Sequence, residues 1–232
     1  MQSNQEILVI AATDSELGAA RELLGKNTRG IHIATTGAGK VSAALTTLEL
    51  VQEKRPDWII QIGCAGAYPT SGLHTGDAAV ADLEIFADEG VEAPDGFLSM
   101  EDIGLPQAAR EGELIYNRVP VHSPSAATLE AIRSVIGDGP RIKTGRFCTV
   151  SCGSGTDSAA ARIVETWNPL VESMEGASAA LVAWKNNIRF SEIRGISNMT
   201  GNRNREEWEI PAACEIAARV LATWVTMEEA SP

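Results

Sequence analysis

The strongest constraint on the fold is an alternation of short apolar runs with segments of helical spacing. The first run, residues 7–12, reads Ile-Leu-Val-Ile-Ala-Ala without a polar break, which is typical of a strand buried on both faces of a parallel sheet. Apolar residues at helical spacing follow at 17–24, and the same order recurs at 30–36 and 41–53. This alternation predicts right-handed β-α-β units that form a parallel sheet.

The pattern continues to the end of the chain. We expect Asp14 or Ser15 to cap the first helix, which places Glu16 in its first turn. Further strands are predicted at residues 58–62, 78–86, 141–150 and 190–198, and further helices at 125–136, 158–165, 176–183 and 211–228. With 232 residues the chain is long enough for one α/β domain with a real core, spanning residues 1–232.

Residues 88–124 interrupt this alternation. Acidic residues are mixed there with glycines and prolines, and no period is clear. A long segment of this kind in a compact domain is usually a functional lid or a disordered segment. We therefore predict an irregular excursion.

Charge and cysteine content limit the possible partners. The net charge is −12, from 31 acids and 19 bases, and no Lys/Arg run is present, which argues against nucleic acid or an anionic membrane as a partner. The first residues lack a signal-peptide pattern and no apolar stretch approaches eighteen residues, so the cytoplasm is expected. Cys148 and Cys152 lack a CxxC pair or a His partner, so we expect reduced thiols rather than a zinc site.

Polar residues follow two of the predicted strands. Residues 170–177 end in acids before a helix of small residues, and residues 190–198 end in Ser197 and Asn198. Ligands bind beyond the carboxyl ends of strands in an open α/β sheet, so Glu175 and Asn198 are predicted to face one pocket. The segment Gly37-Ala-Gly-Lys40 lacks the longer loop and the Ser/Thr of a phosphate loop, and close packing of a strand–helix turn explains it better.

Six segments, taken in order, resemble purine nucleoside phosphorylases and nucleosidases. Their order matches the methylthioadenosine/S-adenosylhomocysteine nucleosidase branch best, and the resemblance covers nearly the whole chain. The segments are residues 12–16, 36–41, 62–66, 76–77, 173–177 and 194–198. Residues 87–97 and 197–203, with Trp208, look like futalosine hydrolases, which release hypoxanthine from futalosine on a route to menaquinone.

This resemblance implies the fold and the reaction class. The fold would be one three-layer α/β domain, with a mixed, mostly parallel sheet between helices. The reaction would be hydrolysis of an N-ribosidic bond without a cofactor or metal. Relatives assemble as dimers or larger oligomers, so the excursion at 88–124 is expected to complete a neighbour's site.

The resemblance also implies roles for two carboxylates. Glu175 would accept hydrogen bonds from both ribose hydroxyls and favour positive charge on the sugar, with Met174 packed on the ribose. Glu16 matches the acid that activates water. Either acid, taken alone, is also explained by the preference of carboxylates for helix N-termini.

Other positions distinguish water from phosphate as the nucleophile. The phosphorylase relatives bind phosphate with two arginines, but this chain has no Arg between Ala11 and Ala20 and has Gln61 at the second position. A phosphate dianion beside Glu16 would lack a cation, so water is the expected nucleophile. Ala65 and Gly66 are expected to approach the substrate through their backbone.

Asn198 is the departure from the methylthioadenosine nucleosidases, which have Asp here. An amide donates to N7 or to a 6-oxygen, which favours hypoxanthine over adenine as the leaving base. An adenine nucleosidase acting on aminodeoxyfutalosine or methylthioadenosine is the alternative, and a nucleoside-binding protein without catalysis is less consistent with both acids being present.

The substrate tail is the least defined part. We predict that Arg203 binds the benzoate-like tail of futalosine and that Phe97 contacts its ring, although an exposed Arg needs no such explanation. Residues 151–156 contain no aromatic residue, so the side chain that covers the purine is left open.

Overall fold

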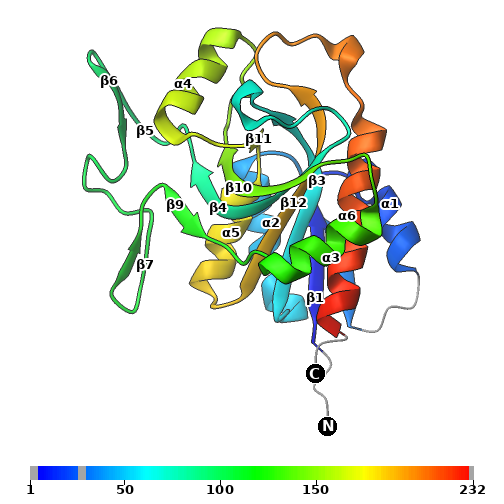
Figure 1. Ribbon diagram of the computed structural model, residues 1–232. Coiled ribbons are helices and arrows are strands. Elements are labelled where there is room, and N and C mark those ends of the chain that lie inside the picture. The colour runs from blue at the N-terminus through cyan, green and yellow to red at the C-terminus, as the bar shows by residue number, and fades with distance from the viewer. Residues whose placement is uncertain (1–4, 26–29, 230–232) are drawn as a thin grey trace.

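The computed structural model describes residues 5–25 and 30–229, which form a central sheet between two layers of helices (Figure 1). The main sheet has the order β11-β10-β4-β12-β3-β1-β2, and β9 pairs with β4. Its strands are β1 (Ile7–Ala11), β2 (Ile31–Thr35), β3 (Trp58–Ala67), β4 (Ala78–Phe86), β9 (Arg118–Pro120), β10 (Ile142–Thr149), β11 (Val171–Ser173) and β12 (Arg189–Met199).

Most strand pairs are parallel, and the exceptions close the sheet. β12 and β9 run antiparallel to β4, and β11 runs antiparallel to β3. Because β11 pairs with β3 as well as with β10, the strands β11, β10, β4, β12 and β3 form a closed ring. The expected mixed, mostly parallel α/β fold is confirmed, and the closure brings β11 beside the end of β3.

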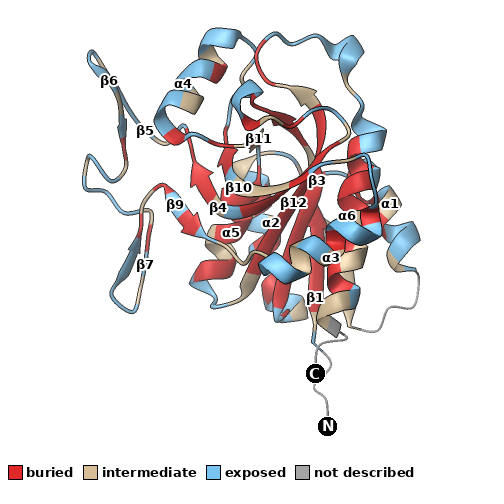
Figure 2. Cartoon of the chain, in the orientation of Figure 1, coloured by how far each residue is buried: buried red, intermediate tan, exposed pale blue. Residues whose placement is uncertain are grey.

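Helices cover both faces of the sheet. On one face α1 (Asp14–Leu24) and α3 (Ala126–Ile136) pack against α6 (Ile210–Glu229), which lies on β12 and β3. On the other face α2 (Lys40–Lys54) packs against α5 (Gly176–Lys185). α4 (Asp157–Trp167) lies near the upper edge in Figure 1. The buried residues concentrate in the sheet and on the inward faces of the helices (Figure 2).

The sequence prediction was wrong on the length of one apolar segment. Ile210–Glu228 is long and apolar enough by composition to cross a membrane, contrary to our expectation that no stretch approaches that length. In the fold this helix is a core element, with Leu221 and Trp224 fully buried against the sheet. Contact with the sheet and two other helices on much of its circumference explains why so few of its residues are charged.

The excursion at 88–124 is more regular than predicted. It contains the hairpin β5 (Gly90–Ala93)–β6 (Gly96–Ser99), the hairpin β7 (Ala108–Arg110)–β8 (Glu113–Ile115), and β9. Strands of three or four residues are too short to show a period in the sequence. Both hairpins project from the body of the domain, and their surfaces are largely exposed (Figures 1 and 2).

Two element boundaries also differ from the prediction. Thr13, not Asp14 or Ser15, precedes the first helix as its N-cap. β3 continues five residues past the predicted end, because the small residues 63–67 pair with both β12 and β11. Residues 63–67 therefore belong to β3, and their backbone lies at the edge of the pocket described below.

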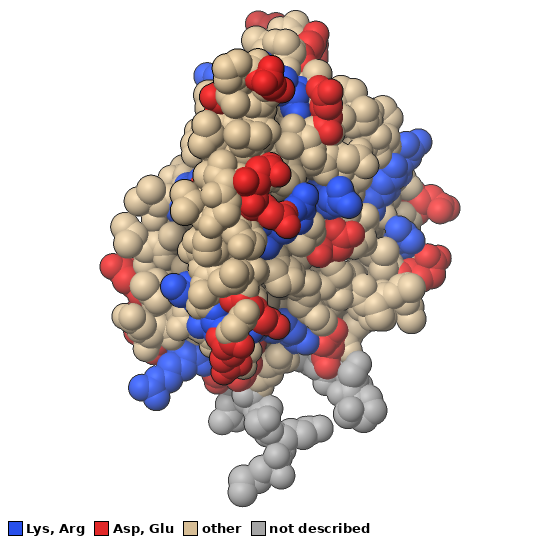
Figure 3. Space-filling view, turned by 90° about the vertical axis from the view of Figure 1, so that its left-hand side faces the viewer, with Lys and Arg blue, Asp and Glu red and all other residues tan. Residues whose placement is uncertain are grey.

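Surface charge is mixed rather than segregated. On the face toward which the hairpins project, Lys and Arg are interspersed with Asp and Glu and separated by wide uncharged areas (Figure 3). This distribution offers no continuous basic surface on that face for a polyanion.

Candidate active site

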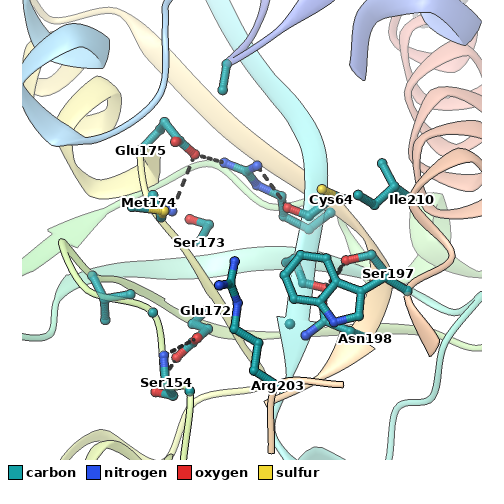
Figure 4. Close-up of a pocket in the computed structure, with 18 of the residues that line it drawn as sticks. Cys64, Ser154, Glu172, Ser173, Met174, Glu175, Ser197, Asn198, Arg203 and Ile210 are labelled. Atoms are coloured by element: carbon teal, nitrogen blue, oxygen red, sulfur yellow. Dashed lines mark hydrogen bonds and ion pairs between the residues drawn. The ribbon is translucent and has the colours of Figure 1, made fainter. Parts of the chain in front are cut away.

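A cavity of about 790 Å³ lies where β3, β11 and β12 end and where α1 and α5 begin. Most of the residues predicted for the site line it together: Glu16, Ala65, Gly66, Met174, Glu175, Asn198 and Arg203. Figure 4 shows Met174 and Glu175 on one side of the cavity and Asn198 on the other. The last residues of β3 pair with both β12 and the antiparallel strand β11, and this closure of the sheet brings the side chains of the three strands to one cavity.

Arg194 lies at the centre of the polar part of the cavity, and the sequence analysis gave it no role. Its Nε lies 2.6 Å from Glu192 Oε1, its Nη2 lies 3.4 Å from Glu175 Oε2, and its Nη1 lies 3.8 Å from Glu16 Oε1. Nη1 also donates to the Cys64 carbonyl at 3.2 Å. One guanidinium thus links the two acids that were predicted to hold the ribose and the water.

The charge of Arg194 is stabilised by these neighbours. Burial alone would lower the pKa of Arg194, but the carboxylates of Glu192, Glu175 and Glu16 raise it above its ordinary value. The guanidinium therefore stays protonated although only 1% of the side chain is exposed. Three carboxylates around one buried cation leave the cluster with a net negative charge.

Glu16 is held by donors from two elements. Its Oε2 accepts from the Thr13 amide at 3.1 Å and from the Thr13 hydroxyl at 3.0 Å, and its Oε1 accepts from the Cys64 amide at 3.1 Å. Burial and the neighbouring Glu16 raise the pKa of the Cys64 thiol to about 11, so this thiol stays protonated. Glu16 caps α1 and lines the cavity at the same time, so the capping and catalytic explanations do not exclude each other.

Gly63 lets Glu16 and Arg194 approach β3 closely. Its φ is 155°, and a Cβ there would lie 2.5 Å from Arg194 Nη1 and 3.1 Å from Glu16 Cδ. Such distances are too short for a carbon atom, so a side chain would push the two groups apart. A glycine at this position is a steric requirement of the ion pair.

Glu175 is fixed from the opposite side of the cavity. Its Oε1 accepts a hydrogen bond from the Gly39 amide at 2.9 Å. Gly39 belongs to the glycine-rich segment at residues 37–40 that resembles a phosphate loop. Lys40 turns instead to Asp88 and Glu89. The interpretation of this segment as a closely packed strand–helix turn agrees with these contacts, and Met174 beside Glu175 keeps 39% of its surface exposed to the cavity.

A β-bulge orients Asn198. β12 pairs with β3 at Ile196 and again at Asn198, and the register shifts between them. Bulges redirect side chains beside active sites. The Ser197 hydroxyl lies 2.8 Å from Asn198 Oδ1, and Asn198 Nδ2 donates to the Met199 carbonyl at 3.0 Å. That carbonyl is the one acceptor recorded for the amide among the described residues, so its second N–H is available to a ligand.

Glu172 is a second residue that the sequence analysis missed. Its carboxylate accepts from the Ser154 amide at 2.8 Å, from the Ser154 hydroxyl at 2.6 Å and from the Tyr68 hydroxyl at 2.7 Å. Burial and Glu172 itself raise the pKa of Tyr68, so this hydroxyl remains a donor. A Cβ built on Gly66 would meet both Asn198 and Glu172, which places the two side chains over the same glycine.

The two residues predicted to meet the tail lie in different places. Arg203 is exposed, lies over the Trp208 ring at 5.3 Å and reaches into the cavity between Glu172 and Asn198 (Figure 4). Phe97 lies on β6, against Trp167 at 6.2 Å, and does not line the cavity. The structure therefore does not bring Phe97 to this chain's own cavity, because the hairpin folds toward α4.

Signals for the missed residues were present in the sequence. Glu192 and Arg194 lie two residues apart inside the strand predicted at 190–198, so their side chains share one face, and opposite charges on one face of an inner strand indicate a buried ion pair. Glu172 was included in the segment at 170–177 but was given no role. The described residues contain no group of three or more His, Cys, Asp or Glu side chains arranged to hold a metal ion.

Comparison with known proteins identifies the family of the chain. Residues 7–226 match the model of the phosphorylase superfamily. The chain is 30% identical to futalosine hydrolase of Acidothermus cellulolyticus, over 81% of this chain and 72% of that protein. It is 32% identical to futalosine hydrolase of Streptomyces coelicolor, over 79% of this chain and 74% of that protein.

The fold agrees with a solved nucleosidase. A methylthioadenosine/S-adenosylhomocysteine nucleosidase of Colwellia psychrerythraea, in complex with adenine, superposes with a TM-score of 0.79 at 18% identity and covers 97% of this chain and 96% of that one. The chain therefore belongs to the phosphorylase superfamily. Within it, the expected resemblance to futalosine hydrolases is confirmed by the two relatives above.

The close approach at Gly63 gives a direct test of the site. We expect Gly63→Ala to lower kcat/KM by about a hundredfold or more, because it displaces the Glu16–Arg194 pair. Gly18→Ala is the matched control, since nothing lies within 4 Å of a Cβ there and Ala stabilises a helix by roughly 0.5–1 kcal/mol. Steady-state nucleosidase assays and circular dichroism check both variants, and full activity of folded Gly63→Ala would contradict the geometry.

Proposed function

We propose that this protein hydrolyses the N-ribosidic bond of futalosine, releasing hypoxanthine and dehypoxanthine futalosine, in menaquinone biosynthesis. The observation that carries the proposal is the combination of the Glu16–Arg194–Glu175 cluster with Glu172 and Asn198 in one cavity. The first three residues suit the sugar and the water, and the last two suit a 6-oxopurine.

The cluster accounts for the bond cleavage. The C1′–N9 bond breaks with its electron pair moving into the purine, and a cation-like sugar is left. Glu175 accepts hydrogen bonds from the ribose hydroxyls and opposes that positive charge. Water attacks C1′ while Glu16 takes its proton, and Arg194 keeps both carboxylates in place.

Water fits the cavity better than phosphate. Among the described residues that line the cavity, the cations are Arg194 and Arg203. Arg194 already contacts three carboxylates, so a phosphate dianion beside Glu16 would be repelled. Gln61, at the position of an arginine in the phosphorylases, is fully buried and offers no charge.

The base is recognised by a donor and an acceptor. The available N–H of Asn198 donates to N7 or to the 6-oxygen, where negative charge gathers as the base leaves. The Glu172 carboxylate suits the N1–H of hypoxanthine, whereas adenine has a lone pair at N1 that a carboxylate would repel. Because both groups favour a 6-oxopurine, hypoxanthine is preferred over the adenine of the alternative substrates.

The tail of futalosine carries a carboxylate that needs a cation. Arg203 supports this role, since among the described pocket residues it is the cation with no recorded ion pair. Its guanidinium and the Trp208 ring beneath it offer a charged donor and an apolar face.

The active form is proposed to be a homodimer or a larger homo-oligomer in the cytoplasm. α2 exposes Val41, Leu45 and Leu48 on one stripe, which begins beside Gly39 at the edge of the site. The hairpins of the excursion do not line this chain's own cavity, which leaves them available to a partner's site. The cysteines in the described part of the chain are free thiols, as expected in a reducing compartment.

Base release tests the proposed reaction. Purified protein without phosphate is incubated with futalosine, aminodeoxyfutalosine, methylthioadenosine and inosine, and the released base is measured by chromatography. We expect hypoxanthine from futalosine, and a fall of about a hundredfold in kcat/KM for Asn198→Asp and for Glu172→Gln. Exposed Glu113→Gln is the control. Adenine release that improves in Asn198→Asp would instead establish the adenine nucleosidase.

Inhibition by the two products tests the role of Arg203. In Arg203→Gln the inhibition constant of dehypoxanthine futalosine should rise by about tenfold or more, because a charge-assisted hydrogen bond is lost, while that of hypoxanthine stays unchanged. A rise for hypoxanthine alone would assign Arg203 to the base instead of the tail.

Light scattering tests the oligomer. Leu45→Glu places a charge on the exposed stripe of α2 and should convert the assembly to monomers with reduced activity. Leu23→Glu on α1, where Leu23 is 52% exposed, should leave the assembly intact. A wild-type monomer with full activity would disprove the proposed assembly.

A further inference from the structure

Two acids that take no part in the reaction proposed above are buried beneath the catalytic cluster. Glu84 on β4 and Glu192 on β12 are both fully inaccessible to solvent. Both carboxyl groups press against the start of α5, where a Cβ on Gly176 would lie 2.7 Å from Glu84 Oε2 and 2.8 Å from Glu192 Cδ. Two buried carboxyl groups in the same place are costly unless a proton or a cation compensates them.

The hydrogen bonds around the pair leave one unpartnered oxygen on each acid. Glu192 Oε1 contacts Arg194 Nε at 2.6 Å, and Glu84 Oε2 accepts from the Thr149 hydroxyl at 3.0 Å. Glu84 Oε1 and Glu192 Oε2 are buried without a recorded partner. The two side chains contact each other, and a proton on one of the acids gives that contact the hydrogen-bond donor that two carboxylates lack.

The charged surroundings decide which acid holds the proton. Among the described residues, the charged groups recorded as acting on Glu84 are Glu192 and Arg194, both on β12. The Cys148 thiol of β10 is kept neutral, since burial raises its pKa well above the ordinary value. Gln61 on β3, paired in register with Glu192, is neutral, and α5 contributes its N-terminal end. Glu192 faces the guanidinium directly and so remains the anion, which leaves the proton on Glu84.

The pair completes a chain of contacts from α5 to the catalytic arginine. The Ala177 amide, in the first turn of α5, donates to the Thr149 hydroxyl at 2.8 Å, and that hydroxyl donates to Glu84. Glu192 then holds Arg194 by Nε, so that the two terminal nitrogens of the guanidinium point to Glu16 and Glu175. A guanidinium held at Nε has little freedom to turn away from those acids.

We propose that Glu84 and Glu192 form an acid–carboxylate pair, with Glu84 as the neutral acid, that positions Arg194 between Glu16 and Glu175. Both are positioning residues, since neither lines the cavity. The effect on turnover rests on the proposed nucleoside hydrolysis, whereas the protonation state of the pair does not depend on it.

Two amide substitutions separate the roles. Glu84→Gln imitates the neutral acid, because its NH₂ donates to Glu192 and its C=O accepts from Thr149, so kcat at neutral pH should stay within about twofold of wild type. Glu192→Gln removes the anion that holds Arg194, and kcat should fall by about a hundredfold with much less change in KM. Glu192→Asp keeps the charge and should restore part of that loss. Glu113→Gln is the exposed control.

Infrared spectroscopy of the protein without substrate reports the proton directly. Wild-type protein at neutral pH should show the C=O stretch of a buried protonated carboxyl group, and Glu84→Gln should lack it. Absence of the band from wild type, or its persistence in Glu84→Gln, would overturn the protonated Glu84. This result stands even if no nucleoside is hydrolysed, so it is separable from failure of the proposed function.

Stability against pH gives a second readout. Burial, then Glu192, raise the pKa of Glu84 well above its ordinary value of 4.5 in the folded protein. The unfolded chain therefore loses this proton first as pH rises, and wild type loses stability relative to Glu84→Gln between pH 4.5 and the folded-state pKa. The difference in melting temperature should widen over that range in favour of Glu84→Gln. Equal pH profiles, or Glu192→Gln with wild-type kcat, would contradict the proposal.

Discussion

The site depends on one guanidinium shared among three buried carboxylates. Arg194 contacts Glu192 through its Nε and Glu175 and Glu16 through its terminal nitrogens, so β12 and the starts of α1 and α5 are linked by a single charge. Buried acids of this kind are strongly destabilising without a cation, and a buried cation is equally so without acids. The polar cluster is therefore one unit. The unit also requires Gly63 and Gly176, because charged side chains of the cluster lie so close to the backbone there that no Cβ would fit.

The cluster around Arg194 explains why this fold would transfer the ribosyl group to water rather than to phosphate. A phosphorylase needs cations that are available to the nucleophile, whereas here the central cation is already neutralised by acids. The excess negative charge opposes a phosphate dianion but favours a cation-like sugar. Base selection is handled separately by Glu172 and Asn198, which lie together over Gly66.

Much of the architecture was predictable, because the spacing of apolar residues along the chain reflects which side chains are buried. The run at residues 7–12 is a strand buried along its length, and Ala78–Phe86 was predicted at its observed bounds. The hairpins at 90–99 and 108–115 were missed, since strands of three or four residues carry too few side chains to show alternation. The predicted N-cap was wrong by one residue: Thr13 is the N-cap, and it hydrogen-bonds to Glu16 in the first turn of the helix.

The residues of the candidate site were also predicted only in part. Glu175 and Asn198 were found because each lies at or just after the end of a predicted strand, but the closure of the sheet through the antiparallel pair β11–β3 is what brings them to one cavity. Phe97 lies outside this chain's own cavity, and nothing local in the sequence sets the direction of the hairpin that carries it. Arg194 was overlooked although Glu192 lies two residues before it on β12, since the other acids that share its guanidinium, Glu16 and Glu175, come from distant parts of the chain.

The most direct measurement is analysis of the sugar product when futalosine is cleaved in the presence of excess inorganic phosphate. A site whose central cation is occupied by acids should give only the free sugar, at a rate that phosphate does not increase. Formation of a sugar 1-phosphate would contradict the account, because it would require a cation in the cluster that is available to the nucleophile.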